Sequence, residues 1–318
     1  MAKKPPAKKS PASRPPAKRP PAKVSSGRPA GLFTWIAVAL VLVIVVTLVI
    51  VKVATNSTAS GSGAYTAAGP TLVDELTQIP DSVFSTVGIT SPDAQIVQPQ
   101  AISGQTKLTG KSSTGATLPM VFYEGAEYCP FCAAQRWPMI IAMSRFGSWS
   151  GLGLMESSTL SGEVYPGTPT FTFLKSTYTS KYLVFSSVER YTNVYSSSLG
   201  FYTPLQTPAK WQTANFEKYD TSKWIKGMSS DQDGSIPFIS IGNKFLVSGS
   251  SYTPATLTSL TRDQVATGLS DPTSPVTDAI IASANYLTEA FCTLTKGQPG
   301  SVCDSPGVLA AKKAMGIK

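Results

Sequence analysis

One long apolar stretch limits what this chain can fold into. Residues 33–51 contain no charged side chain and consist mainly of Val, Leu, Ile and Ala. A helix of this length can cross the roughly 30 Å hydrocarbon core of a bilayer. A cleaved signal peptide is the competing interpretation, but its apolar region is usually only about 7–15 residues long, and no convincing cleavage site follows this stretch. The sequence therefore predicts one transmembrane helix over residues 31–53.

The distribution of charge predicts the orientation of this helix. The chain has 27 Lys and Arg and 18 Asp and Glu, and nine of the basic residues but no acidic residue lie in residues 1–30. The remainder is neutral, which argues against a nucleic-acid partner. Residues 1–30 repeat a Pro-Ala-Lys theme and are expected to form a disordered basic tail on the cytoplasmic side. Binding of this tail to anionic lipid or DNA stays open as the alternative to a role in topology alone.

Everything after the transmembrane helix is then predicted to lie outside the cytoplasm, anchored to the cell membrane by a single pass. Residues 54–70 are rich in Ser, Thr, Gly and Ala and are expected to be a flexible linker. Residues 71–318 are expected to form the extracytoplasmic domain. Disulfides persist there, and Cys292 and Cys303 bracket a turn-rich segment, so we predict a structural disulfide between them. A relay of oxidising equivalents from this pair is the minor alternative.

The other two cysteines form a CxxC motif from Cys129 to Cys132. The motif follows an apolar run over residues 118–123 and begins a segment with helical character over residues 131–146. At the start of a helix, unpaired N–H groups and the positive end of the macrodipole favour a thiolate over a thiol. The pattern therefore indicates thiol-disulfide chemistry. Two alternatives stay open: a metal site, although the chain has no histidine, and a purely structural disulfide.

A second informative stretch begins at residue 234. Pro237 stands immediately before an apolar strand over residues 238–241, which is where a strand accepts a proline. Gly242-Asn243 then predicts a tight turn into a partner strand over residues 244–247. We also expect strands over residues 151–157, 168–174 and 181–188, the last two as an antiparallel pair, and helices within residues 71–87, 209–218 and 274–292.

The order of these elements resembles the thioredoxin fold: a strand, a CxxC at a helix start, further strands, an Ile-Pro before a hairpin, and a final helix. The resemblance implies an α/β domain of thioredoxin-like fold with extra helices and an insertion over residues 157–235. It implies that Cys129 is the attacking thiol and Cys132 the resolving thiol. Pro237 would be the cis-proline that faces the disulfide and helps to bind extended substrate backbone.

Two short stretches point to a narrower resemblance. They are Glu-Tyr-Cys-Pro-Phe-Cys at residues 127–132 and Ile-Gly-Asn-Lys at residues 241–244. Both are similar to a family of membrane-anchored, thioredoxin-like bacterial and archaeal proteins that carries a domain of unknown function. The CxxC itself is also similar to the Cys-Pro-x-Cys of extracytoplasmic disulfide oxidoreductases.

These patterns predict a membrane-anchored thiol-disulfide oxidoreductase that acts on exported protein thiols and disulfides. It would need no cofactor and would exchange electrons with a membrane-embedded redox partner. Glu124 and Glu127 are candidates for proton transfer to the buried thiol, or else solvated loop acids, and Arg136 is a candidate to contact substrate or these acids. A binding or scaffold module with a static bridge and a copper carrier stay open as alternatives. The motif does not specify whether the protein is an oxidase, a reductase or an isomerase, because its reduction potential and its redox partner determine this.

Overall fold

The structure is a computed structural model that describes residues 65–318. The predicted basic tail, the predicted transmembrane helix and the first part of the predicted linker lie outside these residues. Within residues 65–318, no helix is both long and apolar enough to cross a membrane.

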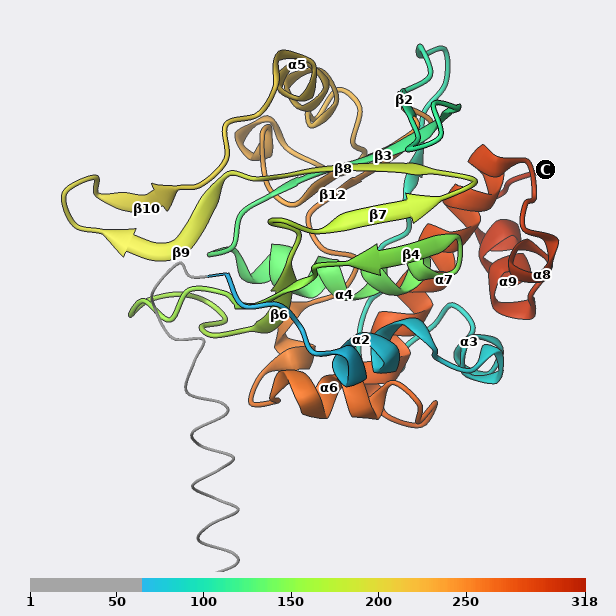
Figure 1. The fold of residues 1–318 in the computed structure, drawn as a ribbon, viewed down its shortest axis with the longest axis horizontal. Helices are drawn as coiled ribbons and strands as arrows, with labels where there is room; N and C mark the ends of the chain where they lie inside the picture. The colour runs from blue at the N-terminus through green and yellow to red at the C-terminus, as the bar shows by residue number, and fades with distance from the viewer. Residues whose placement is uncertain (1–64) are drawn as a thin grey trace, which may run out of the picture. The chain divides into compact units, whose positions relative to one another are not determined.

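Figure 1 shows a mixed α/β architecture with one main sheet, helices on both of its faces and several small strand pairs. The helices are α2 (Pro70–Thr77), α3 (Asp81–Val87), α4 (Pro130–Ser144), α5 (Lys210–Tyr219), α6 (Arg262–Gly268), α7 (Pro275–Thr295), α8 (Gly300–Cys303) and α9 (Pro306–Ala314), with 3-10 turns η1 (Ser230–Gln232) and η2 (Pro254–Leu257). The strands are β1 (Gln100–Ala101), β2 (Thr109–Lys111), β3 (Thr117–Gly125), β4 (Gly147–Ser150), β5 (Gly153–Glu156), β6 (Pro169–Thr172), β7 (Thr177–Ser180), β8 (Val184–Glu189), β9 (Tyr191–Ser196), β10 (Phe201–Pro204), β11 (Phe238–Ile241) and β12 (Phe245–Ser248).

Strand β3 lies in the middle of the main sheet. On one side β11 pairs with it antiparallel, with Phe238 opposite Glu124, and β12 and β1 continue the sheet. On the other side β8 pairs with it in parallel, with Glu189 opposite Gly125. Strand β2 pairs antiparallel with the first residues of β3, on the same side as β11. A parallel pair needs a crossover connection, and α4 lies in the connection between β3 and β8.

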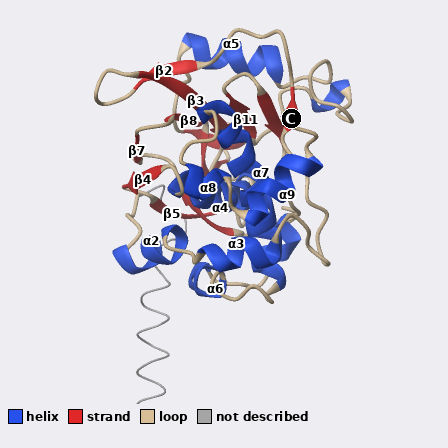
Figure 2. Cartoon of the chain, turned by 90° about the vertical axis from the view of Figure 1, so that its right-hand side faces the viewer, coloured by secondary structure: helices blue, strands red, loops and turns tan. Residues whose placement is uncertain are grey.

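Alternate residues of β3 serve two different apolar cores, because successive side chains of a strand point to opposite faces. Tyr123 belongs to a large core shared with α4 and α7, which pack on each other. Phe122 belongs to a smaller core with Phe216 of α5 and Phe238 of β11. The sheet is therefore enclosed between α5 on one face and the α4–α7 layer on the other, as both views show (Figures 1 and 2).

The strands of the predicted insertion pair differently from the expectation. Residues 168–174 and 181–188 were expected to form an antiparallel pair, but β6 pairs with β5 and β7 pairs with β4. Strand β8 instead joins the main sheet beside β3. That prediction was wrong because β-rich composition identifies a strand but does not specify its partner, which is set by non-local packing.

The predicted linker over residues 54–70 extends too far toward the domain. The Tyr65 hydroxyl donates a hydrogen bond to the Gly151 carbonyl oxygen at 2.7 Å, and Ala67 forms a β-bridge with Gly153. Pro70 already begins α2. Ser, Thr, Gly and Ala are compatible with a linker, but they also fit an extended segment that pairs with a neighbouring strand, so composition misplaced this boundary.

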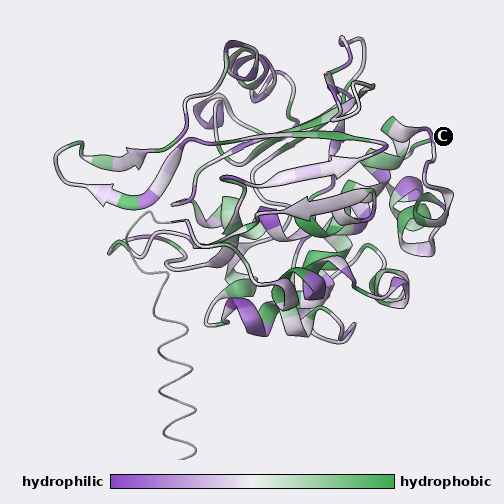
Figure 3. Cartoon of the chain, in the orientation of Figure 1, coloured by the Kyte–Doolittle hydropathy of each residue, from purple (hydrophilic) through white to green (hydrophobic). Residues whose placement is uncertain are grey.

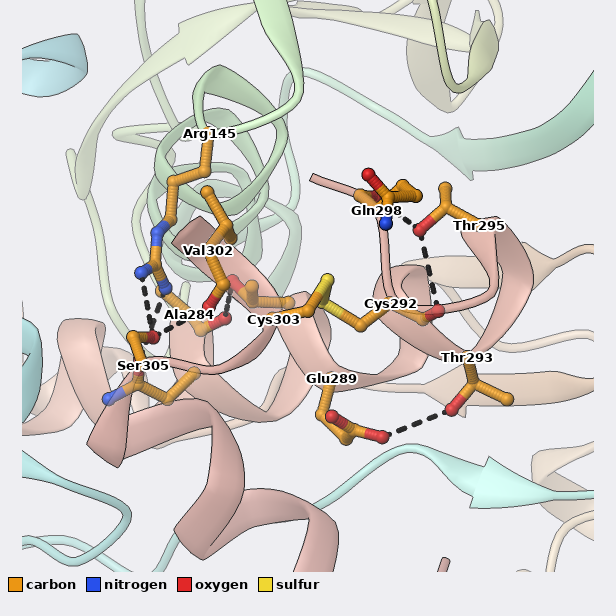
Figure 4. The surroundings of a disulfide bond; sticks show 12 residues. Arg145, Ala284, Glu289, Cys292, Thr293, Thr295, Gln298, Val302, Cys303 and Ser305 are labelled. Carbon is orange, nitrogen blue, oxygen red and sulfur yellow. Dashed lines mark hydrogen bonds between the residues drawn. A yellow bond between two sulfur atoms is a disulfide. The ribbon is translucent and has the colours of Figure 1, made fainter. Parts of the chain in front are cut away.

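The C-terminal helices are joined by a disulfide. Cys292 in α7 and Cys303 in α8 are bonded, with an S–S distance of 1.99 Å and a Cα–Cα distance of 5.6 Å (Figure 4). Between them α7 ends at Thr295, and Lys296 adopts a left-handed conformation with φ 57°. Both cysteines pack in the large core, so the disulfide ties the end of α7 to α8.

Candidate active site

The CxxC motif lies where β3 gives way to α4. Cys129 is the N-cap of α4 and Pro130 is its first residue, a position where the missing N–H of proline leaves no helical hydrogen bond unmade. The Cys129 sulfur accepts a hydrogen bond from the Cys132 backbone N–H at 3.3 Å. Cys129 is 5% exposed and Cys132 is fully buried, and both are free thiols. Both side chains are therefore buried, and only Cys129 keeps a small exposed area.

The pKa values of the two thiols move in opposite directions. Burial disfavours a Cys129 thiolate, but hydrogen bonds from the thiol and backbone of Cys132, together with the charge of Arg136, outweigh burial and lower the Cys129 pKa. Burial, followed by the hydrogen bond and charge of Cys129, raises the Cys132 pKa well above its ordinary value. Cys129 is therefore the thiol of the pair that ionises more readily, and Cys132 is the one that keeps its proton.

Pro237 lies beside the reactive sulfur. The Ile236–Pro237 peptide bond is cis, and the Cys129 thiol lies 3.7 Å from the Ile236 carbonyl oxygen, to which it donates a hydrogen bond. The Pro237 carbonyl accepts a hydrogen bond from the Gly249 N–H at 2.8 Å, which holds this turn against the end of β12. Residues 107 positions apart in the sequence are thereby brought together at one edge of the sheet.

Beneath the motif, Arg136 forms a fully buried ion pair with Glu189. Two guanidinium nitrogens of Arg136 donate to the two carboxylate oxygens of Glu189 at 3.0 and 2.7 Å, and Arg136 also donates to the Ala126 carbonyl at 2.9 Å. Both side chains are inaccessible to solvent. The structure therefore pairs Arg136 with an acid that the sequence analysis did not select. The sequence did contain one signal for Glu189, which is the last residue of a predominantly uncharged strand. Strand β8 pairs with β3 so that Glu189 lies opposite Gly125, shortly before the motif.

Glu127 lies in the same buried region. It is 1% exposed, and its carboxylate accepts a hydrogen bond from the Thr172 hydroxyl at 2.7 Å. Burial, and then the negative charge of Glu189, raises the Glu127 pKa from 4.5 to about 7. Glu127 is therefore not a solvated loop acid, and its carboxyl group can gain or lose a proton near neutral pH.

Glu124 lies on the other face of the sheet, with the α5 core. It is fully buried and forms an ion pair with Arg190, whose guanidinium lies over the Phe216 ring at 5.2 Å. Burial raises the Glu124 pKa, while the charge of Arg190 acts in the opposite direction. The two acids named from the sequence are thus separated by the sheet, and only Glu127 shares the face of α4.

The site contains groups for thiol chemistry rather than a preformed metal cage. Within residues 65–318, no group of three or more His, Cys, Asp or Glu side chains is positioned to hold a metal ion. Cys129 and Cys132 supply two thiol ligands, and the other two cysteines are bonded to each other. The arrangement can form and break a disulfide with one slightly exposed thiol, one fully buried thiol and buried charges beside them.

Comparison with known proteins gives one match. A family model described as a domain of unknown function, DUF929, matches residues 105–293. This range includes the main sheet from β2 onward, the CxxC motif and most of α7. No curated protein and no solved structure matches the chain.

Proposed function

The chain belongs to the DUF929 family, a domain of unknown function, and we propose that this member is a thiol-disulfide oxidoreductase. The observation that carries the proposal is the asymmetry of the CxxC pair. Cys129 keeps a small exposed area, accepts a hydrogen bond from the start of α4 and has a lowered pKa, whereas Cys132 is fully buried with a raised pKa. Exchange chemistry needs one thiolate that can attack or leave and a second thiol protected from solvent.

The proposed fold is thioredoxin-like, and the chain order supports it. Strand β3, helix α4 and the parallel strand β8 come first, then α5 on the opposite face, then the hairpin β11–β12 and helix α7. The sheet order β8, β3, β11, β12 is the one that this fold uses. Strands β4–β7 and the β9–β10 hairpin are additions to that core, and the position of Pro237 against Cys129 is consistent with the same fold.

The reaction can be written from the disulfide form. A client thiolate attacks the Cys129 sulfur, the Cys129–Cys132 bond breaks, and the Cys132 sulfur leaves with the electron pair and takes up a proton. A second client thiolate then attacks the client sulfur of this mixed disulfide, and Cys129 leaves as a thiolate. The client loses two electrons and two protons and gains a disulfide. The protein gains the two electrons and, at Cys132, one proton, while the second proton passes to solvent and Cys129 ends as a thiolate. The reverse sequence reduces a client disulfide.

The buried groups fit these steps. The lowered pKa of Cys129 makes its thiolate a good leaving group, and the raised pKa of Cys132 favours uptake of a proton there. Glu127, on the face of α4 and with a pKa of about 7, is the group in this region best suited to exchange that proton. The Arg136 guanidinium, held in place by Glu189, is a fixed positive charge that favours the thiolate.

We place the reaction outside the cytoplasm, on exported proteins, with the chain anchored in the cell membrane and supplied by a membrane-embedded redox partner. The support is the apolar stretch over residues 33–51 and the basic residues that precede it. A disulfide between Cys292 and Cys303 is consistent with an oxidising compartment.

A redox titration tests the proposal. The full-length chain in detergent micelles is equilibrated in glutathione buffers of graded potential, free thiols are alkylated, and the Cys129 and Cys132 peptides are quantified by mass spectrometry. The Cys292→Ala/Cys303→Ala variant is the matched control, since it removes the other pair. We expect one reversible two-electron transition. A potential near about −120 mV indicates an oxidase, and one near about −270 mV indicates a reductase. If the pair does not exchange at any potential, the proposal is wrong and a static bridge in a binding module takes its place.

A further inference from the structure

The surface around the CxxC motif exposes an unusual number of large apolar side chains. Within residues 65–318, three exposed large apolar side chains lie outside this group: Val97 in the segment before β1, Trp211 on α5 and Leu309 on α9. The others, which we call the apolar rim, come from the first turn of α4, the loop over residues 157–168 and the β9–β10 hairpin: Phe131, Leu160, Val164, Tyr195, Leu199 and Phe201.

Direct contacts connect the apolar rim to the motif. The Ser158 N–H donates to the carbonyl of Tyr128, the residue before the motif, at 2.9 Å. The Tyr128 and Tyr202 rings are stacked with centroids 4.1 Å apart, and the Tyr202 and Ser158 hydroxyl groups are hydrogen-bonded at 2.7 Å. Phe131 meets the Tyr165 ring edge to face at 6.0 Å. The loop and the hairpin are therefore held beside the reactive sulfur.

The apolar rim is also nearly free of charge. Residues 191–204 contain no charged side chain, and residues 157–168 contain only Glu163, whose carboxylate accepts a hydrogen bond from Tyr202. In Figure 3 α5 is largely hydrophilic, while the β9–β10 hairpin carries hydrophobic and intermediate colours together with a hydrophilic band in β9. An uncharged apolar surface selects against charged partners, because burying an unpaired charge is costly.

We infer that the apolar rim binds an extended, uncharged client segment with aliphatic or aromatic residues close to the client cysteine. This inference rests on the proposed function and names its substrate class. Folded proteins bury most such side chains, so an unfolded or newly exported segment is the partner that presents them. Binding on the apolar rim would hold the client sulfur next to Cys129, and this proximity raises the rate of attack.

Equilibrium binding tests the inference without chemistry. The probe is a short dye-labelled peptide in which serine replaces the client cysteine, flanked by Phe and Leu, and a second peptide is flanked by Ser and Asn. Val164→Ser/Leu199→Ser removes the two most exposed side chains of the apolar rim, which are 71% and 60% exposed. Leu309→Ser is the control, because this side chain is 45% exposed on α9, which follows Ser305, a hydrogen-bond partner of Arg145 at the opposite end of α4 from the motif.

Fluorescence anisotropy with full-length protein in detergent micelles should show tighter binding of the Phe/Leu peptide than of the Ser/Asn peptide. The rim variant should raise the Kd of the Phe/Leu peptide about tenfold, since two partly buried aliphatic contacts are lost. The control variant should leave this Kd unchanged. Equal Kd values for wild type and the rim variant, or an equal loss in the control, would overturn the inference.

Further measurements test whether the apolar rim binds lipid or a second copy of the chain instead of a peptide, and whether thiol exchange occurs. If the rim variant instead loses binding to phosphatidylcholine vesicles, or changes from dimer to monomer in light scattering while the peptide binds neither form, the inference is wrong. Thiol exchange is measured separately, with the same peptides carrying cysteine. Loss of all exchange with intact peptide binding would refute the proposed function alone. Normal exchange with no preference for the Phe/Leu peptide would refute the inference alone.

Discussion

The two cysteine pairs of this chain lie at opposite ends of helices. Cys129 and Cys132 occupy the N-terminal start of α4, three positions apart, and are free thiols. Cys292 lies in the last turns of α7 and Cys303 is the last residue of α8, and these two are bonded. A helix start stabilises a negative charge and a helix end does not. The same side chain therefore has the setting that the proposed exchange requires in one place and forms a covalent tie in the other.

The surroundings of the two pairs differ in the same sense. The CxxC pair has the Arg136–Glu189 ion pair beneath it and the Ile236 carbonyl beside it. Cys292 and Cys303 pack within the large apolar core. Two cysteines alone do not indicate a role. Their position in the fold and the charges near them are the better guide.

The first prediction concerns the Cys129 sulfur, whose removal should have the greatest effect on the rate of exchange. Replacing Cys129 by Ser should lower the rate of thiol-disulfide exchange with a dithiol substrate by at least about 1000-fold, because a serine hydroxyl is not ionised at neutral pH and cannot form the mixed disulfide. The rate is measured by quenched-flow alkylation of the substrate. Cys292→Ala/Cys303→Ala is the control and should keep its rate within about twofold. Equal losses in the two variants would show that the pairs act as one unit.

The second prediction concerns the charge beneath the motif. Arg136→Met should lower the free energy of unfolding by about 3–5 kcal/mol, because Glu189 is then buried without a partner. It should also raise the Cys129 pKa, since the Arg136 charge helps to lower it. Urea denaturation measures the first effect and the pH dependence of iodoacetamide alkylation measures the second.

The matched control for this prediction is Arg136→Met/Glu189→Leu, which removes both charges. It should recover most of the lost stability, because no buried charge is left unpaired. It should not recover the Cys129 pKa, which depends on the missing positive charge. If the single and double variants are equally unstable, packing of the long arginine side chain rather than charge holds this region together.

The third prediction tests the structural pair. Cys292→Ala/Cys303→Ala should lower the free energy of unfolding by about 3 kcal/mol, because the disulfide closes a loop across 11 positions and restricts the unfolded chain. Urea denaturation under non-reducing conditions measures the change, with wild type in reducing buffer as a second comparison. A tenfold loss of exchange at the CxxC pair, with little loss of stability, would favour the relay of oxidising equivalents instead.

Local sequence signals predicted much of this picture. The apolar run before the motif became β3, the helix expected over residues 131–146 is α4 over Pro130–Ser144, and the hairpin after Pro237 is β11–β12. Each of these depends on nearby residues: a first-turn proline, a two-residue turn, a run of apolar side chains. Such features are set by neighbours in the chain, so they can be read from it.

What could not be predicted depends on contacts between distant residues. The Arg136–Glu189 pair joins positions 53 apart, and it exists because β8 lies parallel to β3. Because residues 181–188 were expected to pair with residues 168–174, no partner for Arg136 was expected at the end of that strand. Glu124 and Glu127 are close in sequence, yet the sheet separates them. Which acid faces α4 depends on the pleat of β3 and on where it ends, which composition does not specify.

The last prediction concerns the pH dependence of stability that the raised pKa of Glu127 should cause. Its pKa is raised from 4.5 to about 7, so the folded state holds this proton longer than the unfolded chain does. The resulting contribution to stability is fully present below pH 4.5 and is lost as the pH rises through about 7. Between pH 4.5 and 8, the wild type should therefore lose about 2–3 kcal/mol of unfolding free energy relative to Glu127→Gln.

Urea denaturation at several pH values measures this difference, with Glu217→Gln on the exposed surface of α5 as the matched loss of one acid. The Glu127→Gln variant also tests the proposed exchange of a proton between Glu127 and Cys132. If Glu127 exchanges the proton, Glu127→Gln should flatten the pH dependence of thiol exchange around pH 7 while the Cys129 alkylation profile keeps its midpoint. A variant whose stability and exchange rate both follow the wild type across this range would show that Glu127 keeps one charge state throughout. The charge asymmetry of the CxxC pair would then rest on Arg136, Glu189 and the start of α4 alone.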